Sequence, residues 1–379
     1  MDFDSIIKNG TVVDGSKNAE KNRADVGVKG ERIVAIGDLQ DAESATVVNA
    51  ENRIVCPGFI DVHVHSERTL VGGHDQFVGT HQGIPTHLLA PDGFGWAPLP
   101  AELSAQMYHY TSFAYGDQPV PPLCSSPQDY LDLFDGTTPA NVAPQVPHCA
   151  VRLAAMGWAD RAADDEELEA MRTSTRAWME AGATALNLGL DYQPSANATL
   201  EELVELCKVA ESFGGVYAAH LRYQDYGRSR AWDEIIELSR ASGIPVHISH
   251  ERVDEESLEK LERVEREGID LTFESYLYPA GMTHGLMLLP MRYQAGSPQE
   301  VMARLKEPQA RSDCTPELNE KLGVKKGSQI IGYTASGRFE GSTLGEAAES
   351  VGCSCEDLLF DLILEGVGSF IFPWQTSDD

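Results

Sequence analysis

The sequence predicts an α/β chain in which a small N-terminal β-unit precedes a TIM-like (β/α) barrel that lacks its eighth strand. Three observations support this fold class. Short β-rich runs separated by glycine turns fill residues 1–56. From Pro57 onward, apolar strands alternate with helices, the pattern of βα units around a parallel sheet. Several of these strands end in polar side chains, as strands of functional (β/α) barrels do.

Residues 1–56 are expected to form part of a small β-sandwich. Its β-rich runs occupy residues 6–13, 24–28 and 32–37. Asn9-Gly10 and Lys29-Gly30 have the composition of hairpin turns, whose residues often adopt positive φ. We therefore expect antiparallel pairing within this unit.

The barrel is expected to occupy residues 57–379. Thr199 and Glu202 form the pattern of a capping box at a helix start, and Gly214 and Gly243 are placed to end helices before the next strand. Several strands are apolar throughout, as a buried parallel sheet requires. The candidate strands are 58–65, 85–91, 142–152, 183–190, 216–222, 244–250 and 270–278.

The simple alternation stops after the seventh candidate strand. Residues 290–366 are expected to be an insertion with short helices, including 298–306 and 354–365. Phe370-Ile371-Phe372 is the pattern of one further short strand. No eighth βα unit follows it before residue 379.

Composition excludes several classes of partner. The net charge of −30 disfavours nucleic acid and anionic membrane surfaces, because few cations are available to neutralise phosphates. Seven scattered cysteines without a Cys-x-x-Cys pair predict reduced thiols and a cytoplasmic location. No signal peptide and no 18-residue apolar stretch is visible.

A histidine pair ends the first candidate strand, in the segment from Pro57 to Glu67. Alternate residues of a strand point to one face, so Asp61, His63 and His65 are expected to project together. Two imidazoles on one face can close on a metal ion. The alternative is a pair of histidines that only bond backbone groups of a half-buried strand.

Other polar residues stand at the ends of later strands. Asp92 follows the second strand, His220 ends the fifth, and His250 ends the sixth, whereas His247 is expected to face away from His250. On one barrel these side chains would converge at one mouth. Four imidazoles and one carboxylate suit zinc, as one ion or as two ions bridged by Asp92. The predicted metal ligands are His63, His65, Asp92, His220 and His250.

The chain resembles the N-acyl-D-amino-acid deacylase (D-aminoacylase) branch of the amidohydrolase superfamily, from about residue 5 to the end. The resemblance implies zinc-dependent hydrolysis of the linear amide of a small-molecule N-acyl-D-amino acid, which yields a carboxylate and a free D-amino acid. The segments that carry it are Pro57–Glu67, Gly93–Pro98, Asn141–Arg152, Ala181–Ala183, Gly189–Tyr192, Gly214–Arg222 and His247–His250.

The sequence departs from this branch at several positions near the expected site, including Gln224 and Asn187-Leu188, and two departures affect expected ligands. Asp92 stands where the family typically has a cysteine ligand, and a carboxylate is a harder ligand than a thiolate. Arg252 replaces a lysine that holds the substrate carboxylate, and its guanidinium can do so as a bidentate fork. Tyr278 resembles a second carboxylate-contacting position, with a barrel-rim aromatic as the alternative.

The family's general base is an aspartate after the eighth strand. Asp378, in Ser377-Asp378, superficially resembles it, but the surrounding pattern is that of a helix cap and acidic first turn. We therefore expect the base beyond residue 379 and the chain to be a fragment truncated at its C-terminus.

Two other functions remain open from the residues. One is a hydantoinase-like or dihydropyrimidinase-like amidohydrolase acting on a cyclic amide. Relatives of that kind usually bridge two metals with a carboxylated lysine, and no lysine occurs between residues 31 and 207. The other is an inactive metal-binding fragment without the catalytic aspartate.

Overall fold

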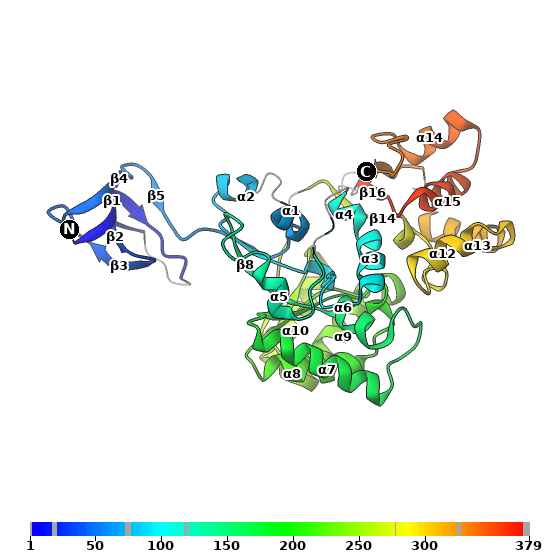
Figure 1. Cartoon of the computed structure of the whole chain (residues 1–379), viewed down its shortest axis with the longest axis horizontal. Helices are drawn as coiled ribbons and strands as arrows, with labels where there is room; N and C mark the ends of the chain where they lie inside the picture. Colours follow the sequence, from blue (N-terminus) through cyan, green and yellow to red (C-terminus); the bar gives the residue numbers. More distant parts are fainter. Residues whose placement is uncertain are drawn as a thin grey trace. The chain divides into compact units, whose positions relative to one another are not determined.

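The chain forms two compact units in the computed structural model. The structure describes residues 2–16, 21–72, 77–116, 120, 122–276, 278–323 and 327–373. The smaller unit comprises residues 1–60 with 83–85, and the larger one 61–82 with 86–379. Figure 1 shows the strands of the first unit and the helices and sheets of the second.

The smaller unit is one five-stranded sheet of order β3-β2-β1-β4, with β5 beside β1. The pairs β1–β2 and β2–β3 are antiparallel, whereas β4 and β5 run parallel to β1. The strands are β1 Phe3–Val12, β2 Asn22–Lys29, β3 Arg32–Gly37, β4 Ser44–Asn49 and β5 Ile54–Val55.

One of the two expected turns of this unit was wrong. Lys29 pairs with Arg32 across a hairpin, as the sequence predicted. Asn9-Gly10 instead lies inside β1, where the pairing register shifts and Asn9 has a φ of 65°. The Asp25 carboxylate accepts the Asn9 N–H at 2.8 Å and so stabilises this bulge. Turns and bulges both use positive φ, so the dipeptide alone did not distinguish them.

The larger unit contains two mainly parallel sheets. One has the order β13-β12-β11-β10-β9 with every pair parallel, and the other has the order β6-β7-β8. Within the described residues neither sheet closes on itself. Their strands are β6 Ile60–Asp61, β7 Thr86–Leu88, β8 Asn141–Ala143, β9 Val146–Pro147, β10 Ala185–Gly189, β11 Val216–His220, β12 Val246–Ile248 and β13 Leu271–Phe273.

Several predicted strands were longer than the observed ones, including the seventh, which ends at Phe273, and two predictions differ most from the structure. The first strand, expected over 58–65, ends at Asp61, so His63 and His65 follow it rather than lie within it. The third, expected over 142–152, is split into β8 and β9 and then becomes helix α6 (His148–Met156). Alanine, leucine and methionine favour helix in this segment, and an apolar run alone does not separate buried strand from buried helix.

Helices follow the strands of the larger unit. They are α1 Glu67–Gly72, α2 Phe77–His81, η1 Pro91–Gly93, α3 Ala101–Tyr110, α4 Ser112–Tyr115, α5 Pro127–Asp132, α7 Asp165–Glu180, η2 Ser195–Asn197, α8 Leu200–Glu211, α9 Tyr223–Ser242 and α10 Glu255–Glu267. Thr199 caps α8 through the Glu202 N–H at 3.2 Å. Glu202 does not complete the expected capping box of α8, because its carboxylate instead bonds Arg152 and His148.

The C-terminal part adds an antiparallel sheet of order β14-β16-β15 and a group of helices. Helices α12 and α15 confirm the expected helices at 298–306 and 354–365, and β16 contains the expected strand at 370–372. The elements are β14 Ala280–His284, α11 Gly285–Leu288, η3 Met291–Tyr293, α12 Pro298–Leu305, α13 Pro308–Leu322, β15 Ile330–Tyr333, α14 Leu344–Val351, α15 Cys355–Glu365 and β16 Ser369–Pro373.

Two hydrophobic clusters hold the larger unit together. The first surrounds the five-stranded parallel sheet and includes Trp178 and Trp232, both almost completely buried. The second includes Phe94, Leu289 and Phe370 and packs the C-terminal helices. No helix in the described part of the chain is long and apolar enough to cross a membrane.

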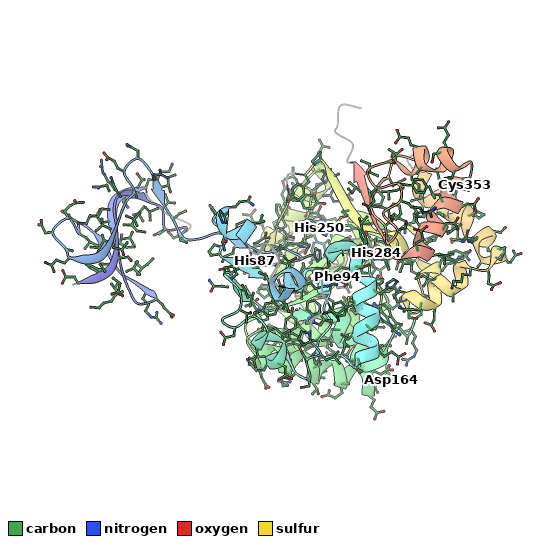
Figure 2. The ribbon with its side chains drawn as sticks, turned by 45° about the horizontal axis from the view of Figure 1, so that its top comes forward. His87, Phe94, Asp164, His250, His284 and Cys353 are labelled. Carbon is green, nitrogen blue, oxygen red and sulfur yellow. The ribbon has the colours of Figure 1, made fainter. Side chains whose placement is uncertain are left out.

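His284 is a titratable group buried within this second packing region. Its ring is 0% exposed and lies 4.7 Å from the Tyr110 ring and 5.0 Å from the Phe113 ring, between centroids. Figure 2 labels His284 within the larger unit. Burial and then the Lys321 charge lower the pKa of His284 to about 3.

This pKa predicts a loss of stability in acid. Between pH 6.5 and about 3 the unfolded chain binds a proton at His284 that the folded chain does not, so stability falls as pH falls. The contribution is about 1.4 kcal/mol per pH unit in this window. The unfolding free energy, measured with guanidinium at pH 6 and at pH 4, should fall less between the two pH values in His284→Asn than in the parent protein. An equal fall in the two proteins would contradict the assignment.

Candidate metal centre

Asp92 is placed by a tight turn that follows β7. It lies in η1 with a φ of 55°, Ala90 has a φ of 61°, and Asp92 is 4% exposed. The turn packs closely on β10: a Cβ added to Gly93 would lie only 2.6 Å from the backbone carbonyl oxygen of Asn187. The backbone therefore directs a buried carboxylate from a conformation that L-residues rarely adopt.

Glu67 holds this turn. The side chain is 1% exposed; one oxygen accepts the Ala90 N–H and the other accepts the Tyr115 hydroxyl at 2.6 Å. A buried carboxylate needs such partners. Glu67 was not among the predicted site residues, although it follows the histidine pair by two positions.

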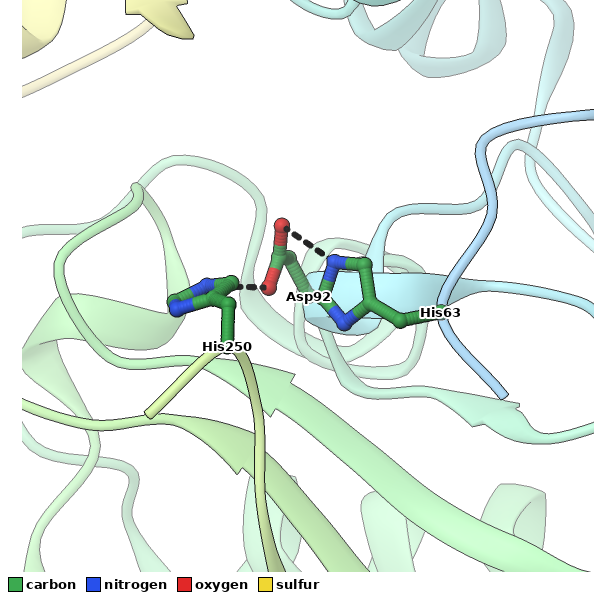
Figure 3. Close-up of side chains that lie close together, drawn as sticks. All are labelled: His63, Asp92 and His250. Atoms are coloured by element: carbon green, nitrogen blue, oxygen red, sulfur yellow. Dashed lines mark ion pairs between the residues drawn. The ribbon is translucent and has the colours of Figure 1, made fainter. Parts of the chain in front are cut away.

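Three imidazoles face the Asp92 carboxylate. The Nε2 atoms of His63 and His65 lie 3.6 Å and 3.5 Å from Asp92 Oδ2, and His250 Nε2 lies 3.7 Å from Oδ1. Donor atoms of His63, Asp92 and His250 all lie within 4.8 Å of one another, as Figure 3 shows for the three side chains. Segments far apart in the sequence thus meet at one carboxylate.

These distances and the unpaired atoms suit a metal ion. Separations of 3.5–3.7 Å are longer than hydrogen bonds. Two ligands at about 2.0–2.1 Å from a tetrahedral zinc lie roughly 3.3–3.4 Å apart. Asp92 Oδ1 and His65 Nδ1 are buried without a hydrogen-bond partner. Imidazole nitrogen with carboxylate oxygen is a donor set that zinc accepts.

His220 contacts this group through His250. Its Nδ1 lies 2.9 Å from His250 Nε2, and its Nε2 lies 3.0 Å from Asp191 Oδ2. The second Asp191 oxygen accepts the Gln224 N–H at 3.0 Å. Asp191, which was not predicted, therefore fixes the orientation of a predicted ligand.

The electrostatics of the group favour a cation. Burial alone would lower the pKa of His63, but Asp92 and then Glu274 raise it to about 10. Burial would raise the pKa of Asp92, but the facing imidazoles, His63 above all, hold it well below its usual range. Burial also lowers the pKa of His250. The carboxylate is therefore ionised, and a bound metal would displace the His63 proton.

Of the two predicted substrate-contacting residues, Tyr278 is linked to this group through the ring of Tyr276, and Arg252 follows His250 by two positions. Tyr278 is 71% exposed and its ring centroid lies 5.3 Å from that of Tyr276. The Tyr276 ring lies 6.3 Å from the His250 ring; burial raises its pKa, and the Arg252 charge acts in the opposite direction. Tyr276, which was not predicted, is thus a tyrosine beside His250. Asp378 lies outside the described residues.

Curated relatives match most of the chain, whereas no family model matches it. A D-aminoacylase from Alcaligenes xylosoxydans xylosoxydans is 36% identical over 299 residues, which cover 74% of this chain and 58% of that protein. An N-acyl-D-glutamate deacylase from the same organism is 33% identical over 301 residues, covering 76% and 59%. The chain thus spans somewhat less than two thirds of these relatives' length.

Solved structures extend the similarity to the fold. A D-aminoacylase with a binuclear metal centre matches with a TM-score of 0.76 at 27% identity, covering 99% of this chain and 72% of that one. An N-acyl-D-glutamate deacylase from Bordetella bronchiseptica, complexed with zinc and a phosphonate inhibitor, matches with a TM-score of 0.77 at 26% identity, covering 100% and 73%. The chain is therefore a homologue of the D-aminoacylases and N-acyl-D-glutamate deacylases and belongs to the amidohydrolase superfamily.

Proposed function

We propose that the chain is a metal-dependent hydrolase that cleaves the linear amide bond of N-acyl-D-amino acids to a carboxylate and a free D-amino acid. The observation that carries this proposal is the meeting of His63, Asp92 and His250 around one point. Homology to two deacylases of this substrate class supports it.

The proposed metal ligands are His63, His65, Asp92, His220 and His250, with zinc as one or two ions. Zinc held there would act as a Lewis acid on the acyl carbonyl and lower the pKa of a bound water. Asp92 reaches imidazoles through both of its oxygens, which supports a bridging role between two ions. The binuclear centre of a D-aminoacylase and the zinc in a related deacylase agree with this reading.

Arg252 is proposed to hold the carboxylate of the substrate, and Tyr278 to contact the same group. Arg252 follows His250 by two positions, and its charge acts on Tyr276. A guanidinium binds a carboxylate through two parallel hydrogen bonds, which fixes the orientation of the amide relative to the metal ligands.

The remaining proposals concern the domains of the chain and its cellular location. Residues 1–56 would form a small β-domain and residues 57–379 the barrel domain with an insertion at about 290–366, in which β6 to β13 supply the barrel strands. A cytoplasmic location is supported by the seven cysteines, all of which the structure describes and none of which forms a disulfide.

The test is hydrolysis by the purified chain loaded with zinc. N-acetyl-D-amino acids should release free amino acid, their L-enantiomers should react poorly, and chelation should stop the release. Ring opening of a hydantoin or dihydrouracil without deacylation would instead support a cyclic-amide hydrolase. Bound zinc without turnover of any substrate would support an inactive metal-binding fragment.

A further inference from the structure

Glu274 lies behind the metal centre, just after the end of β13. Its Oε1 lies 3.0 Å from His63 Nδ1 and accepts the backbone N–H of His250 at 2.8 Å. Its Oε2 pairs with His247 Nε2. One carboxylate therefore contacts two of the grouped ligands, His63 through its ring and His250 through its backbone.

The contact with His63 determines which ring nitrogen faces the metal centre. With the Nδ1–H donating to Glu274, the Nε2 lone pair of a neutral imidazole faces Asp92, 3.6 Å away. Carboxylates in this position fix the tautomer and the ring orientation of metal-bound histidines and raise their basicity.

The contact with His250 supports a backbone conformation. His250 has a φ of 40°, which is unusual for a residue with a side chain. Its N–H donates to Glu274, so the turn that carries the His250 ring is tied to the end of β13. The same oxygen thus positions two side chains that come from different strand ends.

Glu274 is itself held in place by the neighbouring strand. Its partner His247 lies in β12, directly opposite Thr272 of β13, and the His247 Nδ1 lies 2.7 Å from Thr272 Oγ1. A side chain of the parallel sheet therefore restrains Glu274 through the carboxylate oxygen that His63 does not contact. This contact gives His247, which was expected to face away from His250, a part in the arrangement.

We propose that Glu274 is a positioning residue that fixes the tautomer and orientation of His63 and the turn of His250, and thereby sets the metal affinity of the centre. The inference rests on the proposed metal site. It requires that the carboxylate of Glu274 acts through His63. The loss of zinc affinity on replacing Glu274 should therefore depend on His63, which a general loss of packing would not produce.

The experiment measures zinc affinity of the full chain by chelator competition and records the visible spectrum of the Co²⁺-loaded protein. Glu274→Gln should bind zinc about 10- to 100-fold more weakly and shift the Co²⁺ spectrum. Glu262→Gln, at a glutamate whose side chain is 74% exposed, is the matched control and should leave both unchanged. Unchanged affinity and spectrum in Glu274→Gln would overturn the inference.

A double-variant cycle tests whether the effect passes through His63. In a His63→Gln background, most of the affinity loss caused by Glu274→Gln should disappear, whereas an equal loss in both backgrounds would contradict the inference. Glu274→Asp keeps the charge and shortens the side chain, and provides the same comparison if Glu274→Gln does not fold. Parent protein that binds no zinc would refute the metal site itself.

Discussion

Replacing Asp92 with alanine is expected to remove metal binding and to lower kcat/KM on an N-acyl-D-amino acid on the order of 10³-fold or more. Asp92 is the group around which the imidazoles of His63, His65 and His250 gather. Without it those rings lose their shared anionic partner. A cation would then meet three neutral or protonated imidazoles in a buried site.

The comparison requires metal analysis and kinetics of the same preparations. Asp132→Ala, at an exposed aspartate on α5, is the control and should retain both metal and activity. Asp92→Ala with full metal content and parental turnover would show that the carboxylate has no part in the centre.

Replacing Arg152 with methionine is expected to cost about 3–5 kcal/mol of unfolding free energy, the range for breaking a buried ion pair. Arg152 is 0% exposed and pairs with Glu202, which is 3% exposed. It also donates to the Arg161 carbonyl at 2.6 Å. Methionine fills similar volume but leaves the Glu202 charge with His148 alone, at 3.2 Å.

Urea unfolding followed by tryptophan fluorescence measures this effect, because the four tryptophans that the structure describes belong to the larger unit. Arg240→Met is the control: Arg240 forms a surface pair with Glu267, and such pairs contribute about 0–1 kcal/mol. Equal destabilisation by the two substitutions would show that the buried ion pair contributes no more to the unfolding free energy than the surface pair.

The sequence predicted which distant residues meet, although it misplaced some backbone. His63, Asp92 and His250 were expected together because ends of parallel strands share one edge, and the structure brings them together. The argument that His63 and His65 share the face of a strand was wrong, since β6 ends at Asp61. The segment beyond the strand still brings both rings to Asp92.

The supporting carboxylates were not predicted. Glu67, Asp191 and Glu274 act through contacts with residues remote in sequence, and a lone acid carries no periodic signal of its partner. The partner of Glu202 was not predicted either. Its spacing from Thr199 predicted a helix cap, whereas its side chain pairs with Arg152. Local patterns predict elements, whereas such pairings depend on the packing of whole strands and helices.

A metal ion is expected to occupy the space between His63, Asp92 and His250. The most direct test is anomalous diffraction at the zinc edge from crystals of the zinc-loaded chain. We expect an anomalous peak within ligand distance of Asp92 and of the Nε2 atoms of His63 and His250. A zinc-loaded protein with no peak there, or with its only peak elsewhere, would contradict this expectation.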